Sequence, residues 1–229
     1  MKYLLSLALA AFVLTASAPL SAAQSEVPAE AEPVVTADAD VIDVAADIAA
    51  DIYFWDVDKS HSAVTFTVRH FFTPVSGTFG DYDVELLFDP ANLAESRINV
   101  TIAVNSVDTR NERRDQDLRS ANFFEAETYP TITFTSSHIE AAGENEFVAH
   151  GELTIRDVTT DFALPFSVLG VMELSAAQTE RTGRKARAGF AAETSLDRHD
   201  YGVGSGNWAE NTVVGANVDV SVTIEASRK

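Results

Sequence analysis

Apolar and polar side chains alternate in run after run from residue 64 to residue 224. In the segment VTFTVR, which begins at Val64, every second residue is apolar. A period of two puts successive side chains on opposite faces of a β-strand, and one apolar face is typical of antiparallel sheet. We therefore predict an all-β chain with these strands: Val64–Arg69, Tyr82–Phe88, Ile98–Val104, Ile132–Ser136, Phe147–Ile155, Phe162–Val168, Ala186–Ala192 and Val214–Ile224.

About eight long amphipathic strands can form a sandwich or a closed barrel, and the alternation alone does not decide between them. Closure removes the unpaired edges that make long strands prone to aggregate. A barrel of this size has room for one small or slender ligand. The sequence contains no cysteine, so the fold has no disulfide framework and the chain performs no thiolate chemistry.

The N-terminal residues differ in composition from the rest of the chain. Lys2, an apolar run from Leu4 to about Ala18 and the small residues before position 24 predict a cleaved signal peptide over 1–23. Residues 24–51 hold eight acidic side chains and no basic one, so we predict a disordered acidic leader. The folded domain is expected over 52–229, with no membrane span after cleavage.

Net charge limits the partners of this chain. The formal charge is −19 at pH 7, so a phosphate backbone or an anionic lipid surface is repelled by the body of the protein. We expect no nucleic-acid partner. The histidines show no close two-ligand spacing, so we expect no metal site.

A charge-rich stretch interrupts the strand pattern ahead of residue 132. Thr109–Leu118 is a short helix candidate, because Asp108 or Thr109 can accept hydrogen bonds from the free N–H groups of a first turn. Asp115 and Arg119 stand four residues apart, within reach of each other on such a helix. We therefore expect a short helical cover that leads directly into the next strand.

Several short motifs occur together and in order between Tyr53 and Ala226: His61-Ser62, Phe66-x-Val68-x-His70, Gly77-x-Phe79, Phe88-Asp89-Pro90, Asn105–Thr109, Arg114-Asp115, Leu118-Arg119, Phe123-Phe124, Tyr129-Pro130, Ile132-x-Phe134, Gly151-x-Leu153-Thr154-Ile155, Arg198-x-Asp200-Tyr201-Gly202 and Val218–Glu225. This pattern resembles the YceI-like family of bacterial secreted proteins. The resemblance implies a closed, antiparallel, eight-stranded lipocalin-like barrel with a short helical cover. It also implies an interior that binds a long apolar molecule of the polyisoprenoid, quinone or fatty-acid-amide type.

Two residues depart from the family pattern. Asp157 stands where the family usually has Gly, in the turn after Ile155, and Tyr201 replaces a more common Trp or Phe. Because Asp tolerates left-handed turn geometry better than most residues, we expect the hairpin to form.

Strand parity selects thirteen side chains for the inward face, and we expect them to line the cavity: Val64, Phe66, Val68, Leu86, Ile98, Val100, Ile102, Ile132, Phe134, Leu153, Ile155, Leu164 and Phe166.

Five further residues are expected at the cavity mouth. His70 shares the inward parity and is either a core histidine bonded to a carbonyl or a donor to a ligand head group. The resemblance places Arg114 and Asp115 where the cover meets the barrel, so they either contact a ligand oxygen or fix the helix. Phe123 and Phe124, like Phe71 and Phe72, are plugs of the barrel end, ligand contacts, or both.

The leading functional hypothesis is a periplasmic carrier or store for a long apolar ligand, without cofactor and without catalysis. A structural or stress-response barrel with a filled core is the alternative. A lipid-ester hydrolase is a weaker one, since no G-x-S-x-G motif is present and Ser60-His61-Ser62 are sequence neighbours rather than a convergent triad. The oligomeric state is left open, with a homodimer as one alternative.

Overall fold

The computed structural model describes residues 53–229. The predicted signal peptide and acidic leader lie outside the described residues, so both assignments stay predictions. The described elements are β1 (Phe54–Val57), β2 (Ala63–His70), β3 (Thr73–Phe79), β4 (Tyr82–Leu87), β5 (Arg97–Ala103), η1 (Val104–Ser106), β6 (Val107–Asp108), α2 (Glu112–Arg119), β7 (Thr131–Gly143), β8 (Glu146–Ile155), β9 (Val158–Glu173), α3 (Ala176–Thr182), β10 (Ala186–Asp197), η2 (Arg198–Tyr201), η3 (Gly206–Trp208) and β11 (Val214–Arg228). None of these helices is long and apolar enough to cross a membrane.

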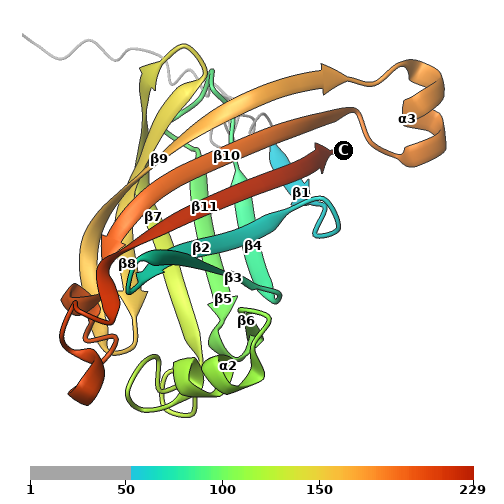
Figure 1. The fold of residues 1–229 in the computed structure, drawn as a ribbon. Helices are drawn as coiled ribbons and strands as arrows, with labels where there is room; N and C mark the ends of the chain where they lie inside the picture. Colours follow the sequence, from blue (N-terminus) through green and yellow to red (C-terminus); the bar gives the residue numbers. More distant parts are fainter. Residues whose placement is uncertain (1–52) are drawn as a thin grey trace, which may run out of the picture. The chain divides into compact units, whose positions relative to one another are not determined.

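Eight strands form the closed ring. Their order is β1-β4-β5-β7-β8-β9-β10-β11, every neighbouring pair is antiparallel, and β11 pairs back with β1 (Figure 1). The predicted closed antiparallel barrel is therefore confirmed. Closure joins distant parts of the chain, since Asp56 is the register partner of Ser227.

The strand β11 is long enough to hold two partners along one edge. Its last residues pair with β1, and Val214 to Thr223 pair with β2. β2 continues into β3, and β3 pairs with β6 only at its last two residues. The alternation did not identify β1, β3 or β6, because they are short or interrupted by Pro74 and Gly77.

The helical cover begins later than predicted. Its N-cap is Asn111, whose side chain accepts from the backbone N–H of Arg114, and neither Asp108 nor Thr109 caps the helix. The physical reason is Arg110, whose φ of 63° is left-handed and separates the preceding residues from the helix. The cover lies at the end of the barrel where β5 ends and β7 begins (Figure 1).

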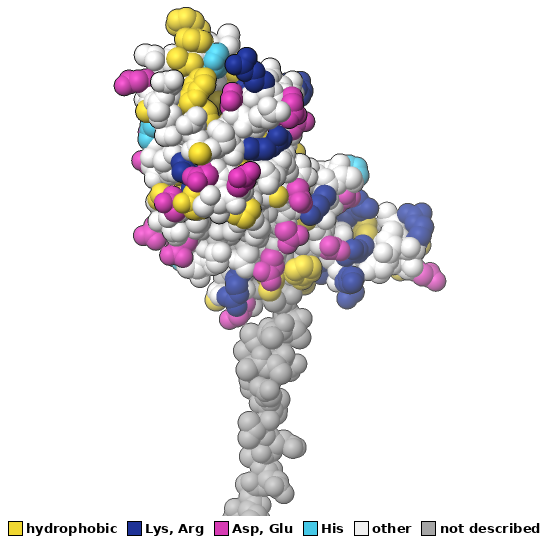
Figure 2. All heavy atoms as spheres, turned by 90° about the horizontal axis from the view of Figure 1, so that it is seen from below, with side chains coloured by type: hydrophobic (Ala, Val, Ile, Leu, Met, Phe, Trp, Pro, Cys, Tyr) yellow, Lys and Arg dark blue, Asp and Glu magenta, His cyan; other side chains and the backbone are white. Residues whose placement is uncertain are grey.

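The strands β9 and β10 run beyond the barrel and form a projecting arm with α3 (Figure 1). Sequence alternation missed this extension, because residues 169–173 read LGVME and do not alternate. The helix α3 carries a capping box between Ser175 and Gln178. Lys and Arg side chains gather on the arm in Figure 2.

An aromatic cluster closes the opposite end of the barrel, where β4 ends and β8 begins. Phe88 packs edge-on against Phe147, Phe166 and Phe190, with ring centroids 5.0 to 5.9 Å apart. Trp55 is 3% exposed and donates its indole N–H to the carbonyl of Phe88 at 2.8 Å. Edge-to-face pairs of this kind add to the free energy gained by burial.

Candidate ligand cavity

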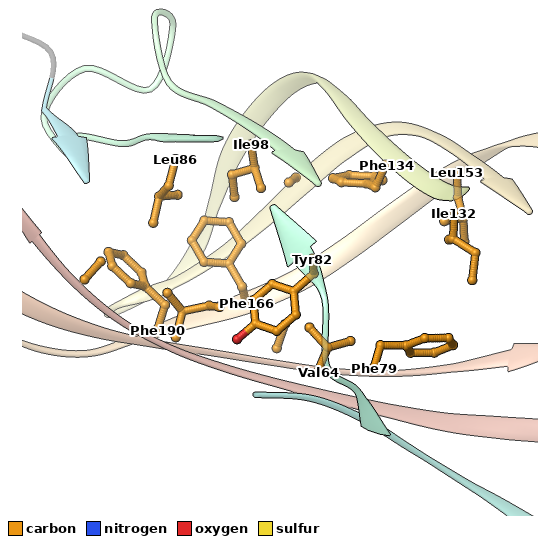
Figure 3. Close-up of a cluster of buried hydrophobic side chains, with 14 of the residues drawn as sticks. Val64, Phe79, Tyr82, Leu86, Ile98, Ile132, Phe134, Leu153, Phe166 and Phe190 are labelled. Carbon is orange, nitrogen blue, oxygen red and sulfur yellow. The ribbon is translucent and has the colours of Figure 1, made fainter. Parts of the chain in front are cut away.

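The barrel encloses a cavity of about 220 Å³. In Figure 3, side chains of β5, β7 and β8, among them Ile98 and Phe134, face those of β2, β3 and β10, among them Val64 and Phe190, with Tyr82 and Phe166 between the two rows. A close-packed interior contains few voids larger than a water molecule, so a space of this size is a ligand-sized cavity.

Twelve of the thirteen predicted lining residues lie on the cavity wall: Val64, Phe66, Leu86, Ile98, Val100, Ile102, Ile132, Phe134, Leu153, Ile155, Leu164 and Phe166. Parity placed them correctly because each belongs to a strand of the ring or to the first half of β2. Their contact with a ligand stays a prediction. Val68 is the exception, since it lies farther along β2 and is only half-buried.

The wall includes further side chains that parity could have found. On β11, Val218, Val220, Val222 and Ile224 alternate and line the cavity together. Phe124, one of the predicted mouth residues, also lies on the wall, whereas Phe123 is buried and packs against Trp208 at a centroid distance of 5.7 Å.

Phe71 and Phe72 do not plug the barrel end, since both are exposed. The expectation that His70 faces inward is also wrong. Its side chain is exposed, and its ring packs against Phe71 with centroids 4.8 Å apart. The reason is the register shift between Val218 and Val214, beyond which the β2–β3 hairpin runs past the ring and no longer encloses an interior.

Two polar side chains of the wall, Thr65 and Tyr201, form hydrogen bonds with other residues of the protein. Thr65 donates to the carbonyl of Ser221 at 3.0 Å, and the hydroxyl groups of Tyr201 and Thr160 share a hydrogen bond of 2.8 Å. The remaining wall is apolar apart from Thr194 and Arg198. The cavity therefore favours an apolar chain and offers little for a polar head group.

Arg198 is a buried residue of the wall that sequence reasoning did not single out as functional. It is 4% exposed, and its guanidinium donates to the carbonyls of Gly215 at 2.9 Å, Val203 at 2.8 Å and Trp208 at 2.7 Å. Burial lowers the pKa of Arg198, and the charge of Asp197 opposes this effect. Because backbone carbonyls take up its N–H groups, Arg198 fastens the η2–η3 segment over the barrel.

The structure shows how the predicted pair Arg114 and Asp115 is used. Asp115 is buried and accepts from the backbone N–H of Thr109 at 2.9 Å and from its hydroxyl at 2.5 Å. Arg114 donates to the hydroxyl and the carbonyl of the same residue at 2.7 and 2.8 Å. Neither residue lies on the cavity wall. Of the two alternatives, these contacts support the fixing of the helix.

The expected pair between Asp115 and Arg119 does not form, because Arg119 instead donates to the carbonyls of Asn105 and Val107. Thr109 itself packs against β3, where a Cβ added to Gly77 would stand 2.8 Å from its methyl group. Only glycine permits this close approach, so the cover is joined to the hairpin at this point.

The β8–β9 hairpin forms as expected, but its left-handed residue is not Asp157. Arg156 takes a φ of 57° there, and its guanidinium pairs with Glu125 at 2.9 Å and donates to the carbonyl of Gly202 at 2.6 Å. These two bonds hold the turn against Glu125, which follows α2, and against Gly202, which ends η2.

Ser60 and His61 form a polar cluster with Asp58 on the surface. Both the Ser60 hydroxyl, at 3.2 Å, and the Asp58 carboxylate, at 2.9 Å, meet the same His61 nitrogen, Nδ1. A triad needs them on opposite nitrogens, so this arrangement is not one. Glu225 brings a third ligand atom within 4.8 Å of Asp58 and His61, a juxtaposition that sequence spacing did not reveal. The predicted absence of a metal is not tested by this geometry.

A model of the YceI-like domain matches residues 55–226. The chain belongs to the YceI-like family. It is 36% identical to the YceI protein of Escherichia coli O157:H7 over 157 residues, which cover 68% of this chain and 78% of the relative. Its fold is similar to the crystal structure of BcnA from Burkholderia cenocepacia, with a TM-score of 0.66, 27% identity and coverage of 75% of this chain and 99% of BcnA.

A third member of this comparison has a similar fold at low sequence identity. It is a domain of Saccharophagus degradans described as a polyisoprenoid binding domain implicated in plant cell wall breakdown. The TM-score is 0.57 at 17% identity, over 77% of this chain and 98% of that domain.

Proposed function

We propose that this YceI-like protein is a periplasmic binding protein that holds a long apolar ligand in its barrel and performs no chemistry on it. The observation that carries the proposal is the 220 Å³ cavity with an almost entirely apolar wall. Burial of a hydrocarbon there contributes about 0.8 kcal/mol for each CH₂ removed from water. The lining residues that the structure describes include no His, Asp, Glu, Lys, Ser or Cys, so the wall carries no general base beside a hydroxyl group.

The ligand class follows from the shape and polarity of this space. Pockets for drug-sized molecules usually occupy about 300–1,000 Å³, so this cavity suits a slender chain rather than a wide ring system. A polyisoprenoid, the tail of a quinone and a fatty-acid amide all meet that requirement. The polyisoprenoid binding described for the Saccharophagus degradans domain supports the first of these. The predicted signal peptide supports a periplasmic location.

The proposal is tested with one substitution on each face of β5. Val100 lies on the cavity wall, and its neighbour Thr101 points outward and is exposed. We expect Val100→Trp to keep its melting temperature and to lose uptake of a long-chain isoprenoid, because the indole takes the space of the ligand. Thr101→Trp should change neither property.

Mass spectrometry of lipid extracted from the native protein identifies the ligand in the same preparation. A filled core gives the opposite result: Val100→Trp is destabilised by about 1–3 kcal/mol through overpacking, and the parent protein takes up no isoprenoid. That combination would refute the carrier function.

A further inference from the structure

The hairpin tip, which we define as His70–Thr73 between β2 and β3, exposes two adjacent aromatic rings. Phe72 is 95% exposed, more than any other large apolar side chain in residues 53–229, and Phe71 is 47% exposed. Hairpin turns usually carry Gly, Asn or Asp at such positions. Two exposed phenylalanines gain little free energy from burial, so the stability of the barrel does not explain their presence at this turn.

The conformation of the tip is fixed rather than loose. Phe71 has a φ of 49°, a left-handed value that disfavours bulky side chains. Its N–H donates to the carbonyl of Val213 at 2.7 Å, and its carbonyl accepts from Arg69. Arg69 also donates to the carbonyl of Asn211 at 2.7 Å. These bonds hold a strained turn in place and keep the aromatic rings presented to the outside.

The charge of the hairpin differs from that of the whole chain. Residues 63–80 contain no Asp or Glu, and their only titratable side chains are Arg69 and His70, whereas the chain carries a net charge of −19. Acidic side chains would be repelled by phosphate groups and costly to dehydrate, so an acid-free hairpin can approach lipid without these two costs.

The hairpin is also continuous with the cavity wall. Val64 and Phe66 of β2 line the cavity, and Phe71 follows five residues later in the chain. At a strand rise of about 3.3 Å per residue, the tip lies about 17 Å from the wall residue Phe66. A membrane that binds the tip would therefore lie about one hairpin length from the cavity.

We propose that the hairpin tip docks this protein on a phospholipid bilayer by inserting Phe71 and Phe72 at the boundary between head groups and acyl chains. Aromatic side chains prefer that boundary, and shallow insertion of this kind is reversible. The inference rests on the proposed function, since the bilayer is where an apolar ligand would be collected or delivered. The arm is the other candidate for a membrane contact, because it also exposes apolar side chains. Several of the basic side chains near them, however, are held in ion pairs with carboxylates.

The test is flotation of the full chain with phosphatidylcholine vesicles, which carry no net charge and so do not repel an acidic protein. We expect Phe72→Ser to lower the partition constant at least about tenfold, as expected for one buried phenyl ring. Phe54→Ser is the matched control, because Phe54 is 55% exposed on β1 and lies outside the hairpin. It should leave the partition constant unchanged.

A second measurement reports the position of the tip directly. The chain has no cysteine, so Phe72→Cys and Phe54→Cys each accept a single environment-sensitive fluorophore. We expect a blue shift on vesicles for the label at position 72 alone. Equal binding by Phe72→Ser and the parent, no binding by the parent, or a blue shift at both positions would overturn the proposal.

Two controls separate this proposal from its alternatives. If the parent is a dimer in the absence of vesicles and Phe72→Ser is a monomer, the tip is a contact between copies and the proposal fails. Uptake of isoprenoid delivered without vesicles should be the same for Phe72→Ser and the parent. If neither takes up isoprenoid while the parent still floats with vesicles, the carrier function fails and the docking stands.

Discussion

Replacement of Arg198 by methionine tests whether a buried guanidinium, bonded mainly to backbone carbonyls, holds the covered end of the barrel. Methionine keeps most of the apolar stem and removes the N–H donors. Five carbonyls then lose a donor, and three of them, those of Val203, Trp208 and Gly215, accept from Arg198 at 2.7 to 2.9 Å. Each buried acceptor left without a partner lowers the free energy of unfolding by about 1–3 kcal/mol. Removal of the buried charge also removes the cost of its desolvation, which offsets part of the total loss. We expect a loss of about 3 kcal/mol.

Urea unfolding measures this loss, and Arg187→Met is the matched control. Arg187 pairs with Glu225 at 2.7 Å on the surface, with about half of its side chain exposed, and such a pair contributes at most about 1 kcal/mol. Hydrogen exchange gives the local readout, since the amides of residues 202–214 should lose protection in Arg198→Met alone. Equal losses for the two variants, or unchanged exchange in that segment, would refute the role assigned to Arg198.

Two other predictions concern the surface. Phe71→Gly should raise the free energy of unfolding by about 1 kcal/mol in thermal or urea unfolding, because glycine removes the strain at a φ of 49°; a decrease would show that the ring stabilises the turn. The Asp58–His61 pair should make stability pH-dependent. Hydrogen bonds from Ser60 and then His61 lower the pKa of Asp58 to about 2, and the hydrogen bond to Asp58 raises the pKa of His61 above 6.5. The pair therefore stabilises the fold between about pH 4 and 6.5, and its contribution falls as pH drops toward 2 or rises through the raised His61 value. The difference in melting temperature between the parent and His61→Asn should be largest in that window, and a difference independent of pH would contradict the assignment.

Local alternation explains why most of the cavity wall could be predicted. Ile132 and Phe134 lie two residues apart on β7, so they must share a face in any sheet that contains that strand. Their register partners on β5, Ile102 and Val100, alternate in the same way. The order of residues within a strand decides which of its faces is buried and which faces solvent. The buried face can therefore be predicted without knowing which strands pair.

The same reasoning failed where tertiary contacts override the local pattern. His70 has inward parity, but at its position the β2–β3 hairpin extends beyond the barrel interior. The helix start was placed too early because the left-handed Arg110 is not visible in the composition. Arg198 belongs to a motif that resembles the family pattern. The residues next to it in the sequence do not show that its guanidinium bonds to five backbone carbonyls, among them that of Gly215.

The sequence by itself determined eight of the eleven strands, the inward face of most long strands, the acidic charge and the absence of thiol chemistry, because these depend on residue type and on a period of two. Only the tertiary structure decided that β1 rather than β2 completes the ring, that Arg114 and Asp115 both bond to Thr109, and that the aromatic tip stands outside the barrel. These outcomes depend on pairings such as Asp56 with Ser227, which are set by the packing of the whole chain and leave no local periodicity.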